Sequence, residues 1–196
     1  MTSSNDGQTA SANARRDTIL DAAIREFGQR GYRKTSIEDL ASAAQISKQG
    51  LYLHFAGKNE VFVAAMQKYL RAGLALVDEG LSRTDQPLSR RLAAAMEAWF
   101  GRHLATFTPT SFDVIEAGDQ LSSKDVEHVK VAFQQRIAKA LASAPAFMNV
   151  PSNRSPQDVA QVLFLCGLTW KDGRPTAQEF SKRVRLCVRV CCHLEE

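Results

Sequence analysis

The hydrophobic residues of this chain recur at the spacing of amphipathic helices along most of its length. Between Ala14 and Phe27 they return every three or four positions, which places them on one helical face. Gly28 and Gly31 follow this run and are expected to end the helix. No stretch convincingly alternates apolar and polar residues in the manner of a half-buried strand. The pattern therefore predicts an all-α fold.

Two short helices are predicted after the first one. Ser36 is a suitable N-cap, and Asp39 lies three residues later, at a spacing similar to that of a capping box. Ser47 is a second suitable N-cap and opens a helix that ends at about His54. A longer helix is then expected over about residues 57–80.

Small residues where the two short helices cross indicate a helix-turn-helix. Ala41 and Ala44 let the helices approach closely, and Ile46 is expected to fill the turn from inside. Because helices this short are unstable alone, the helices on either side must brace them. In this DNA-reading motif the second helix, which opens at Ser47, is the recognition helix.

Two polar residues of the predicted recognition helix suit contact with bases. Lys48 and Gln49 lie at its exposed N-terminal end, where such helices meet base edges. Glutamine can bond bidentately to adenine, and lysine can reach the acceptor atoms of guanine. These side chains are therefore candidates for reading the DNA sequence in the major groove.

Other polar residues near the motif suit contact with phosphate. Tyr52 and His54 lie towards the far end of the recognition helix and carry a hydroxyl and an imidazole group. Lys58 stands at the start of the next helix, where free backbone N–H groups favour an anion. Thr35 and Ser36 offer the same arrangement at the start of the preceding helix.

The residues around this motif resemble the signature of the tetracycline-repressor (TetR) family. The matching stretches are TSIEDLA at 35–41 and ISKQGLYLHFAGKNE at 46–60, preceded by Phe27 and by Gly31-Tyr32. Many positions agree in register over about residues 15–63, which makes the resemblance specific. It implies a three-helix N-terminal domain that binds double-stranded DNA, a homodimer, and a C-terminal helical domain that binds a small-molecule effector. Repression is the usual role in this family, and a twofold-symmetric dimer is expected to read a near-palindromic operator.

The resemblance also assigns individual residues to the DNA. It implies that the groove is contacted by Lys48, Gln49 and Tyr52, and the phosphates by Thr35, His54 and Lys58. Gly50 departs from the pattern, because the family usually has Thr or Ala there, so a hydroxyl contact with phosphate is missing. Glycine inside a helix also costs about 1 kcal/mol. With the N-caps Ser36 and Ser47 included, these residues form the expected DNA-binding site.

The rest of the chain is predicted to be helical, with separators that contain proline, glycine or aspartate. The expected helices are at 88–106, 111–117, 123–142, 156–171 and 176–194. Residues 1–13, rich in Ser, Asn, Thr and Ala, are expected to be a disordered tail. We therefore expect a DNA-binding domain at 14–60 and a helical domain for effector binding and dimerisation at 61–196.

Composition and charge narrow the class of protein only a little. A hydrophobic content of 44% allows a substantial core, and a net charge of +4 permits a polyanionic partner without requiring one. Enzyme motifs such as G-x-S-x-G or H-E-x-x-H are absent from the sequence, so we expect no enzyme, no catalytic residues and no cofactor. Because the chain has no long apolar run and no signal-peptide pattern at its start, we expect a cytoplasmic protein outside membranes.

Several aromatic residues lie in the part of the chain after the DNA-binding motif. Such residues most often form a core, but a histidine among them makes a ligand cavity more plausible. The candidate effector-binding residues are Trp99, His103, Phe107 and Phe133. A cavity with these side chains predicts an apolar or aromatic effector.

The last two predicted helices are more apolar than a single packed face requires. This excess predicts a partner helix pair, and therefore a homodimer through these helices. They also contain the cysteines, of which Cys187 and Cys191 lie one helical turn apart and Cys192 is adjacent. A redox-sensing or metal-sensing regulator with the same DNA-binding domain is the alternative. Metal sites favour closer cysteine pairs, and free cysteine is commonly buried, so we expect packing and no metal.

Overall fold

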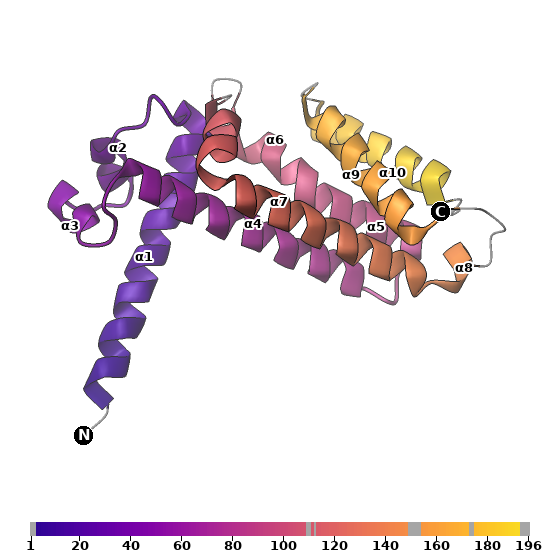
Figure 1. The fold of residues 1–196 in the computed structure, drawn as a ribbon, viewed down its shortest axis with the longest axis horizontal. Helices are drawn as coiled ribbons and strands as arrows, with labels where there is room; N and C mark the ends of the chain where they lie inside the picture. Colours follow the sequence, from indigo (N-terminus) through magenta and orange to yellow (C-terminus); the bar gives the residue numbers. More distant parts are fainter. Residues whose placement is uncertain (1–2, 109–110, 112, 149–153, 173–174, 193–196) are drawn as a thin grey trace. The chain divides into compact units, whose positions relative to one another are not determined.

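The computed structural model describes residues 3–108, 111, 113–148, 154–172 and 175–192, and all regular secondary structure in them is helical (Figure 1). The all-α class expected from the sequence is confirmed. The elements in chain order are α1 (Ser3–Arg30), α2 (Ile37–Ala43), α3 (Lys48–Tyr52), α4 (Lys58–Ser82), α5 (Leu88–Met96), the π-helical segment η1 (Glu97–Gly101), α6 (Arg102–Thr106), α7 (Asp113–Ala142), α8 (Pro145–Met148), α9 (Pro156–Asp172) and α10 (Ala177–Cys192). Among the described residues, no helix is long and apolar enough to cross a membrane.

The helices form two compact units. The N-terminal unit contains Met1–Tyr69 and Thr106–Val126, and the C-terminal unit contains Leu70–Ala105 and Glu127–Glu196. Two long helices, α4 and α7, therefore contribute residues to both units. The N-terminal unit includes the whole segment in which the sequence predicts DNA binding.

The core of the N-terminal unit is built around Phe27 of α1. This side chain is fully buried, and its ring centroid lies 5.2 Å from that of Phe62 on α4 and 5.9 Å from that of Tyr32. Leu40 of α2 and Leu51 of α3 are buried in the same cluster. The two short helices are thus braced by α1 and α4, as their length requires.

Both ends of α1 differ from the sequence prediction. At its C-terminus, Gly31 adopts a left-handed φ of 86° and stops the helix, whereas Gly28 lies within it. Gly28 is required for close approach, because a Cβ atom there would lie 2.3 Å from the carbonyl oxygen of Thr106. At its N-terminus, α1 reaches Ser3 and so includes most of the segment expected to be a disordered tail. Extending an existing helix adds one hydrogen bond for each residue fixed, which explains why a polar, alanine-containing segment can continue it.

The helices of the C-terminal unit follow the predicted pattern with two refinements. The predicted helix at 88–106 is continuous, with η1 inserted between α5 and α6. The two helices predicted before and after Ser122 join as α7, and Ser122 has non-helical torsions (φ −140°, ψ 22°) at the kink. In Figure 1, α9 and α10 lie side by side, and the described part of α10 ends at Cys192.

Candidate nucleic-acid interface

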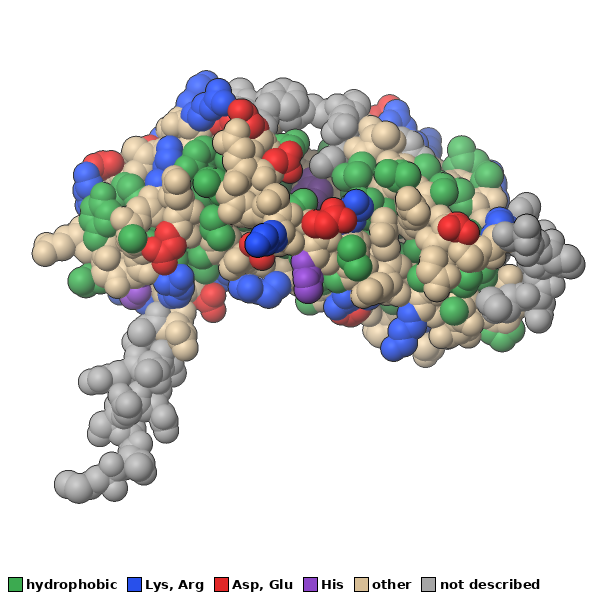
Figure 2. Space-filling view, in the orientation of Figure 1, with side chains coloured by type: hydrophobic (Ala, Val, Ile, Leu, Met, Phe, Trp, Pro, Cys, Tyr) green, Lys and Arg blue, Asp and Glu red, His purple; other side chains and the backbone are tan. Residues whose placement is uncertain are grey.

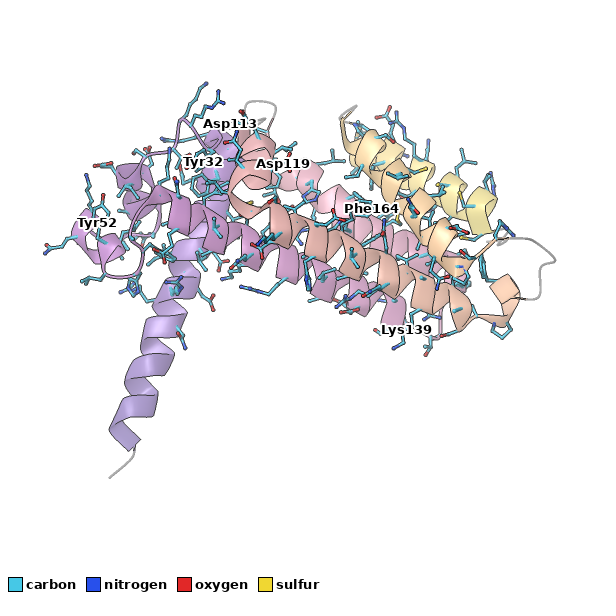
Figure 3. The ribbon with its side chains drawn as sticks, in the orientation of Figure 1. Tyr32, Tyr52, Asp113, Asp119, Lys139 and Phe164 are labelled. Carbon is cyan, nitrogen blue, oxygen red and sulfur yellow. The ribbon has the colours of Figure 1, made fainter. Side chains whose placement is uncertain are left out.

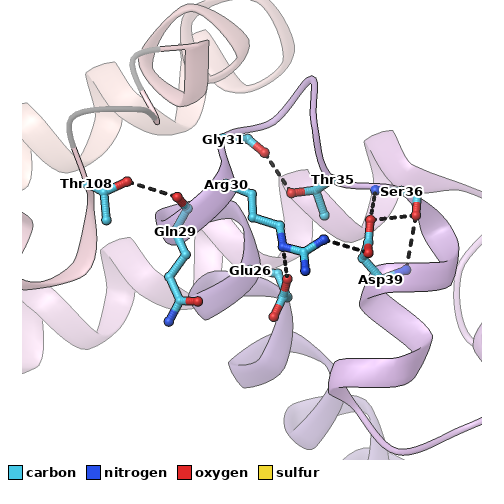
Figure 4. Close-up of polar contacts among 8 residues, drawn as sticks. All are labelled: Glu26, Gln29, Arg30, Gly31, Thr35, Ser36, Asp39 and Thr108. Carbon is cyan, nitrogen blue, oxygen red and sulfur yellow. Dashed lines mark hydrogen bonds and ion pairs between the residues drawn. The ribbon is translucent and has the colours of Figure 1, made fainter.

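The start of α2 is fixed by a reciprocal capping box. The Ser36 hydroxyl oxygen accepts the backbone N–H of Asp39 at 3.1 Å, and the Asp39 carboxylate accepts the backbone N–H of Ser36 at 2.9 Å (Figure 4). The Arg30 guanidinium also donates to this carboxylate, at 2.7 Å. These hydrogen bonds, chiefly those from Ser36, lower the pKa of Asp39 below its usual value. The capping box predicted from the sequence is confirmed.

The turn between α2 and α3 is closed by backbone hydrogen bonds. The N–H of Ile46 donates to the carbonyl of Ala41, and that of Gln45 to the carbonyl of Ser42, both at 3.0 Å. This pair of bonds is a Schellman motif, which needs a left-handed residue after the helix. Gln45 supplies it with a φ of 55°. The turn then leads directly into Ser47, the N-cap of α3.

Replacing Gln45 by glycine should stabilise the protein. Left-handed backbone is disfavoured for residues with a Cβ atom, so Gln45→Gly should raise the free energy of unfolding by about 0.5–1 kcal/mol, while Gln45→Val should lower it by about 1–2 kcal/mol. Urea unfolding of the full chain measures both. In the control, Ser42→Gly within α2 should have the opposite sign to Gln45→Gly, since glycine weakens a helix interior. If Gln45→Gly and Ser42→Gly lower the free energy of unfolding equally, Gln45 does not have a left-handed backbone conformation.

Helix α3 divides into a buried side and an exposed side. Leu51 is its one fully buried residue, and Phe55, which follows the helix, is 2% exposed. Lys48 and Gln49 are exposed at the first turn, and the side chain of Tyr52 (Figure 3) is 48% exposed. The core therefore orients α3 so that the residues predicted to contact the groove face solvent.

Lys48 forms an ion pair with Glu38 of α2. The hydrogen bond from Lys48 lowers the pKa of Glu38, and the same bond raises the pKa of Lys48, so both groups are charged at neutral pH. Both side chains are largely exposed, so water and salt screen their attraction. A DNA phosphate or a guanine acceptor would therefore compete with Glu38 for the same ammonium group.

Removing the carboxylate of Glu38 should tighten DNA binding. In Glu38→Gln the Lys48 ammonium loses its competing anion, and one negative charge leaves the vicinity of α3. We expect affinity for any duplex to rise by about three- to tenfold at low salt, with the gain shrinking as salt is added. Fluorescence anisotropy over a salt series measures this. Glu127→Gln removes an exposed carboxylate of the C-terminal unit and should leave DNA affinity unchanged. An unchanged or weaker affinity for Glu38→Gln would contradict the competition.

The predicted phosphate-contacting residues occupy three different settings. Thr35 is 1% exposed, and its hydroxyl donates to the Gly31 carbonyl at 2.7 Å (Figure 4). Its side chain therefore holds the turn before α2, and the expected hydroxyl contact with phosphate stays a prediction. His54 is partly exposed, and its carbonyl accepts the Arg16 guanidinium at 2.7 Å. Lys58 is partly exposed at the first residue of α4.

The ammonium of Lys58 is held at the turn that precedes α2. Its Nζ donates to the Tyr32 carbonyl at 3.1 Å and lies 4.5 Å from the centroid of the Tyr32 ring. These contacts fix the side chain beside the start of α4, where the first backbone N–H groups of a helix also favour an anion. Ser36 is exposed at the start of the neighbouring helix α2, although its side chain takes part in the capping box.

One part of this region escaped sequence reasoning. The carboxylate of Asp113, at the start of α7, accepts the backbone N–H groups of Tyr32 at 3.0 Å and of Arg33 at 2.6 Å (Figure 3). The Arg33 side chain also pairs with Glu116 at 2.7 Å. The turn before α2 is therefore anchored to α7. No sequence signal links these residues, because about 80 positions separate them.

On the face drawn in Figure 2, basic side chains do not form one continuous patch. Figure 2 shows Lys and Arg interspersed with Asp and Glu on the visible face. Two exposed cations that sequence reasoning missed, Arg33 and Lys34, directly precede Thr35 and α2. The case for DNA contact therefore depends on individual residues around α2 and α3.

The sequence matches known regulators over the same region. Residues 19–65 match the family described as bacterial regulatory proteins, tetR family. Over these residues the chain belongs to the TetR family. Its residues 19–65 contain the N-terminal helix-turn-helix that this family uses to bind DNA.

Proteins similar to this chain include both a repressor and an activator of transcription. The transcriptional repressor KstR2 of Mycobacterium tuberculosis is 29% identical over 145 residues, which are 74% of this chain and 62% of KstR2. The transcriptional activator FasR of Mycolicibacterium smegmatis is 35% identical over 94 residues, 48% of this chain and 42% of FasR. The chain thus spans less than two thirds of either relative. The crystal structure of the TetR family transcriptional regulator PfmR from Thermus thermophilus has 20% identity and a TM-score of 0.66, covering 91% of this chain and 99% of PfmR.

The departure of this TetR-family chain at Gly50 has a local structural reason. The Gly50 N–H donates to the Ser47 hydroxyl at 2.9 Å, which caps α3. A Cβ atom at Gly50 would lie 3.2 Å from that hydroxyl oxygen, closer than most real contacts. Glycine therefore leaves room for the Ser47 cap, while it contributes no side chain to DNA contact.

The four aromatic and histidine residues expected to bind an effector lie in two different units, and two of them are core residues. Trp99 and Phe133 are buried, with ring centroids 5.4 Å apart, and Phe133 also packs on Phe100 at 5.6 Å. Both rings belong to the core of the C-terminal unit, and effector binding by these residues stays a prediction. His103 is partly exposed, 6.4 Å from the Trp99 ring. Phe107 belongs to the N-terminal unit, where it packs on Tyr69 at 5.3 Å. Sequence periodicity marks an inward-facing aromatic residue but does not distinguish core from cavity.

The cysteines of this TetR-family chain are packing residues. The Sγ atoms of Cys187 and Cys191 lie 3.7 Å apart, and both side chains contact the core of the C-terminal unit. Burial raises the pKa of the Cys187 thiol, and it raises that of Cys192 to about 12. Thiols with raised pKa values contain little thiolate and react slowly. Within the described residues no cluster of three or more metal-binding side chains occurs. A thiol-based or metal-based sensor is therefore not favoured.

Proposed function

We propose that this chain is a repressor that binds a near-palindromic operator as a homodimer and releases it when a small-molecule effector binds the C-terminal unit. The observation that carries the proposal is the orientation of α3. Its buried anchor Leu51 turns Lys48, Gln49 and Tyr52 towards solvent on one short, capped helix. That arrangement suits insertion into a major groove.

Exposed apolar side chains on the last two helices support the homodimer. On α9, Val162 and Leu165 are exposed, and on α10 so are Leu186 and Val190. Such residues on paired helices are suited to burial against the same surface of a second copy. A twofold axis there would pair two α3 helices and select an operator with twofold symmetry.

Selection of bound DNA from the source genome tests the proposal. The purified chain is expected to recover fragments that share a sequence with inverted half-sites, and footprinting should protect both halves. A reporter placed behind such a fragment should be silenced when the chain is expressed. Recovered fragments without a shared sequence would contradict operator recognition, and a stimulated reporter would make the chain an activator.

A further inference from the structure

The C-terminal unit contains a cavity that is distinct from its aromatic core. Its volume is about 420 Å³, and its walls come from the end of α4 with the loop that follows, from α5 and η1, and from α10. A cavity of this size falls in the range of small-molecule sites. The side chains that line it are mainly polar, so it differs from the apolar effector site expected from the sequence.

Positive charge dominates the lining of this cavity. It contains five arginines, namely Arg83, Arg90, Arg91, Arg185 and Arg189. A single carboxylate, that of Glu97, accompanies them, and it already accepts a hydrogen bond from the Ser181 hydroxyl at 2.6 Å. Guanidinium groups stay protonated in proteins, so these charges cannot be relieved by proton loss. An anion in the cavity would offset their mutual repulsion.

Three of the five arginines are available to a ligand. Arg91 is engaged, since its Nε donates to the Leu81 carbonyl at 2.8 Å, and Arg83 pairs with Glu79 at 2.9 Å. For the side chains of the other three, the described residues provide neither a hydrogen bond nor an ion pair; these are Arg90, Arg185 and Arg189. All three are exposed, so their donors are free to turn towards a bound group.

Helical spacing brings these arginines to one place. On α10, Arg185 and Arg189 lie four residues apart and share a face. On α5, Arg90 shares its face with Ala93 and Ala94, whose small side chains leave room in front of it. We propose that the cavity binds a small organic ligand that carries at least two phosphate or carboxylate groups. The planar donor fork of arginine fits both groups in a bidentate manner.

The site is compatible with the proposed homodimer. Leu186 and Val190 each follow an arginine of the cavity by one residue, which turns them by about 100° around α10. The apolar surface and the cavity therefore use different sides of this helix. As an effector site the cavity rests on the proposed function, but its ability to bind an oxyanion does not.

Calorimetric titration of the full chain with inorganic pyrophosphate and, separately, with citrate tests the proposal at near-physiological ionic strength. In the variant Arg185→Gln/Arg189→Gln, we expect the Kd of the bound probe to rise by about tenfold or more, because two charged donors are lost. Arg71→Gln/Lys139→Gln is the matched control: both residues are exposed in the C-terminal unit, outside the cavity lining. Its Kd should equal that of the unmodified chain.

The outcomes distinguish a phosphate ligand from a carboxylate ligand. They also distinguish the oxyanion site itself from its role as an effector site. Binding of pyrophosphate alone identifies a phosphate ester, binding of citrate alone identifies a polycarboxylate, and binding of both supports the shared chemistry. No binding of either probe, or equal weakening in the control variant, overturns the site. If a probe binds but leaves operator affinity unchanged, the site stands and its effector role fails. If Arg185→Gln/Arg189→Gln weakens operator binding without a probe, the arginines contact DNA and the small-ligand proposal is wrong.

Discussion

A chain that carries both Leu186→Glu and Val190→Glu is expected to be monomeric and to bind the operator about 100-fold more weakly or worse. The two side chains are 52% and 60% exposed in the single chain, so the substitutions leave its own core intact. In the proposed dimer they would be buried, and an unpaired carboxylate there costs several kcal/mol. Without a partner, each half-site is bound separately and the gain from simultaneous binding is lost.

Sedimentation at micromolar concentration and operator titration measure these two effects. The matched control is Leu76→Glu/Val131→Glu, which places the same charges on exposed apolar residues of α4 and α7. It should remain dimeric and bind DNA normally, while circular dichroism checks that both variants are helical. A monomeric unmodified chain, or a dimeric Leu186→Glu/Val190→Glu variant, would rule out this interface.

The second large effect separates base reading from phosphate contact. Gln49→Ala should cost about 1–3 kcal/mol on the operator and little on random DNA, because the exposed amide on α3 is expected to bond a base edge. Lys58→Ala should weaken binding to both DNAs alike and reduce the log–log salt slope by about one, because its expected partner on DNA is a phosphate.

Anisotropy titrations of both variants on operator and random duplex, each over a salt series, check this difference. Lys130→Ala is a suitable control, since Lys130 pairs with Glu127 in the C-terminal unit. It should change neither affinity nor slope. If Gln49→Ala and Lys58→Ala lose affinity equally on both DNAs, Gln49 does not read bases.

The sequence was most informative where structure depends on nearby residues. Ser36 and Asp39 cap α2 as their spacing predicted, and Ser47 caps α3. Lys48 and Gln49 are exposed at the first turn of α3, as their place at the start of that helix predicted. Caps and helical faces need only the identity of residues within one or two turns, so they can be predicted without knowledge of the fold.

Features that depend on distant residues could not be predicted in this way. Thr35 has the same local pattern as an exposed helix-start hydroxyl, and only the packing of the folded chain buries it. The bond from Tyr32 to Asp113 joins positions 81 residues apart. The arginine cavity likewise combines helices that are distant in sequence, and each of its arginines would otherwise be interpreted as an ordinary solvated side chain.

The division of α3 into one anchor and several exposed positions also bears on how operator preference can diverge. The stability of this helix depends on Leu51 and on the Ser47 cap, whereas the residues proposed to face DNA are Lys48, Gln49 and Tyr52. Exposed substitutions away from caps and anchors usually change stability by less than about 0.5 kcal/mol. Descendants of this gene can therefore come to recognise new operator sequences through substitutions at these positions. Such substitutions would cost little folding stability, so selection for stability would hardly oppose them.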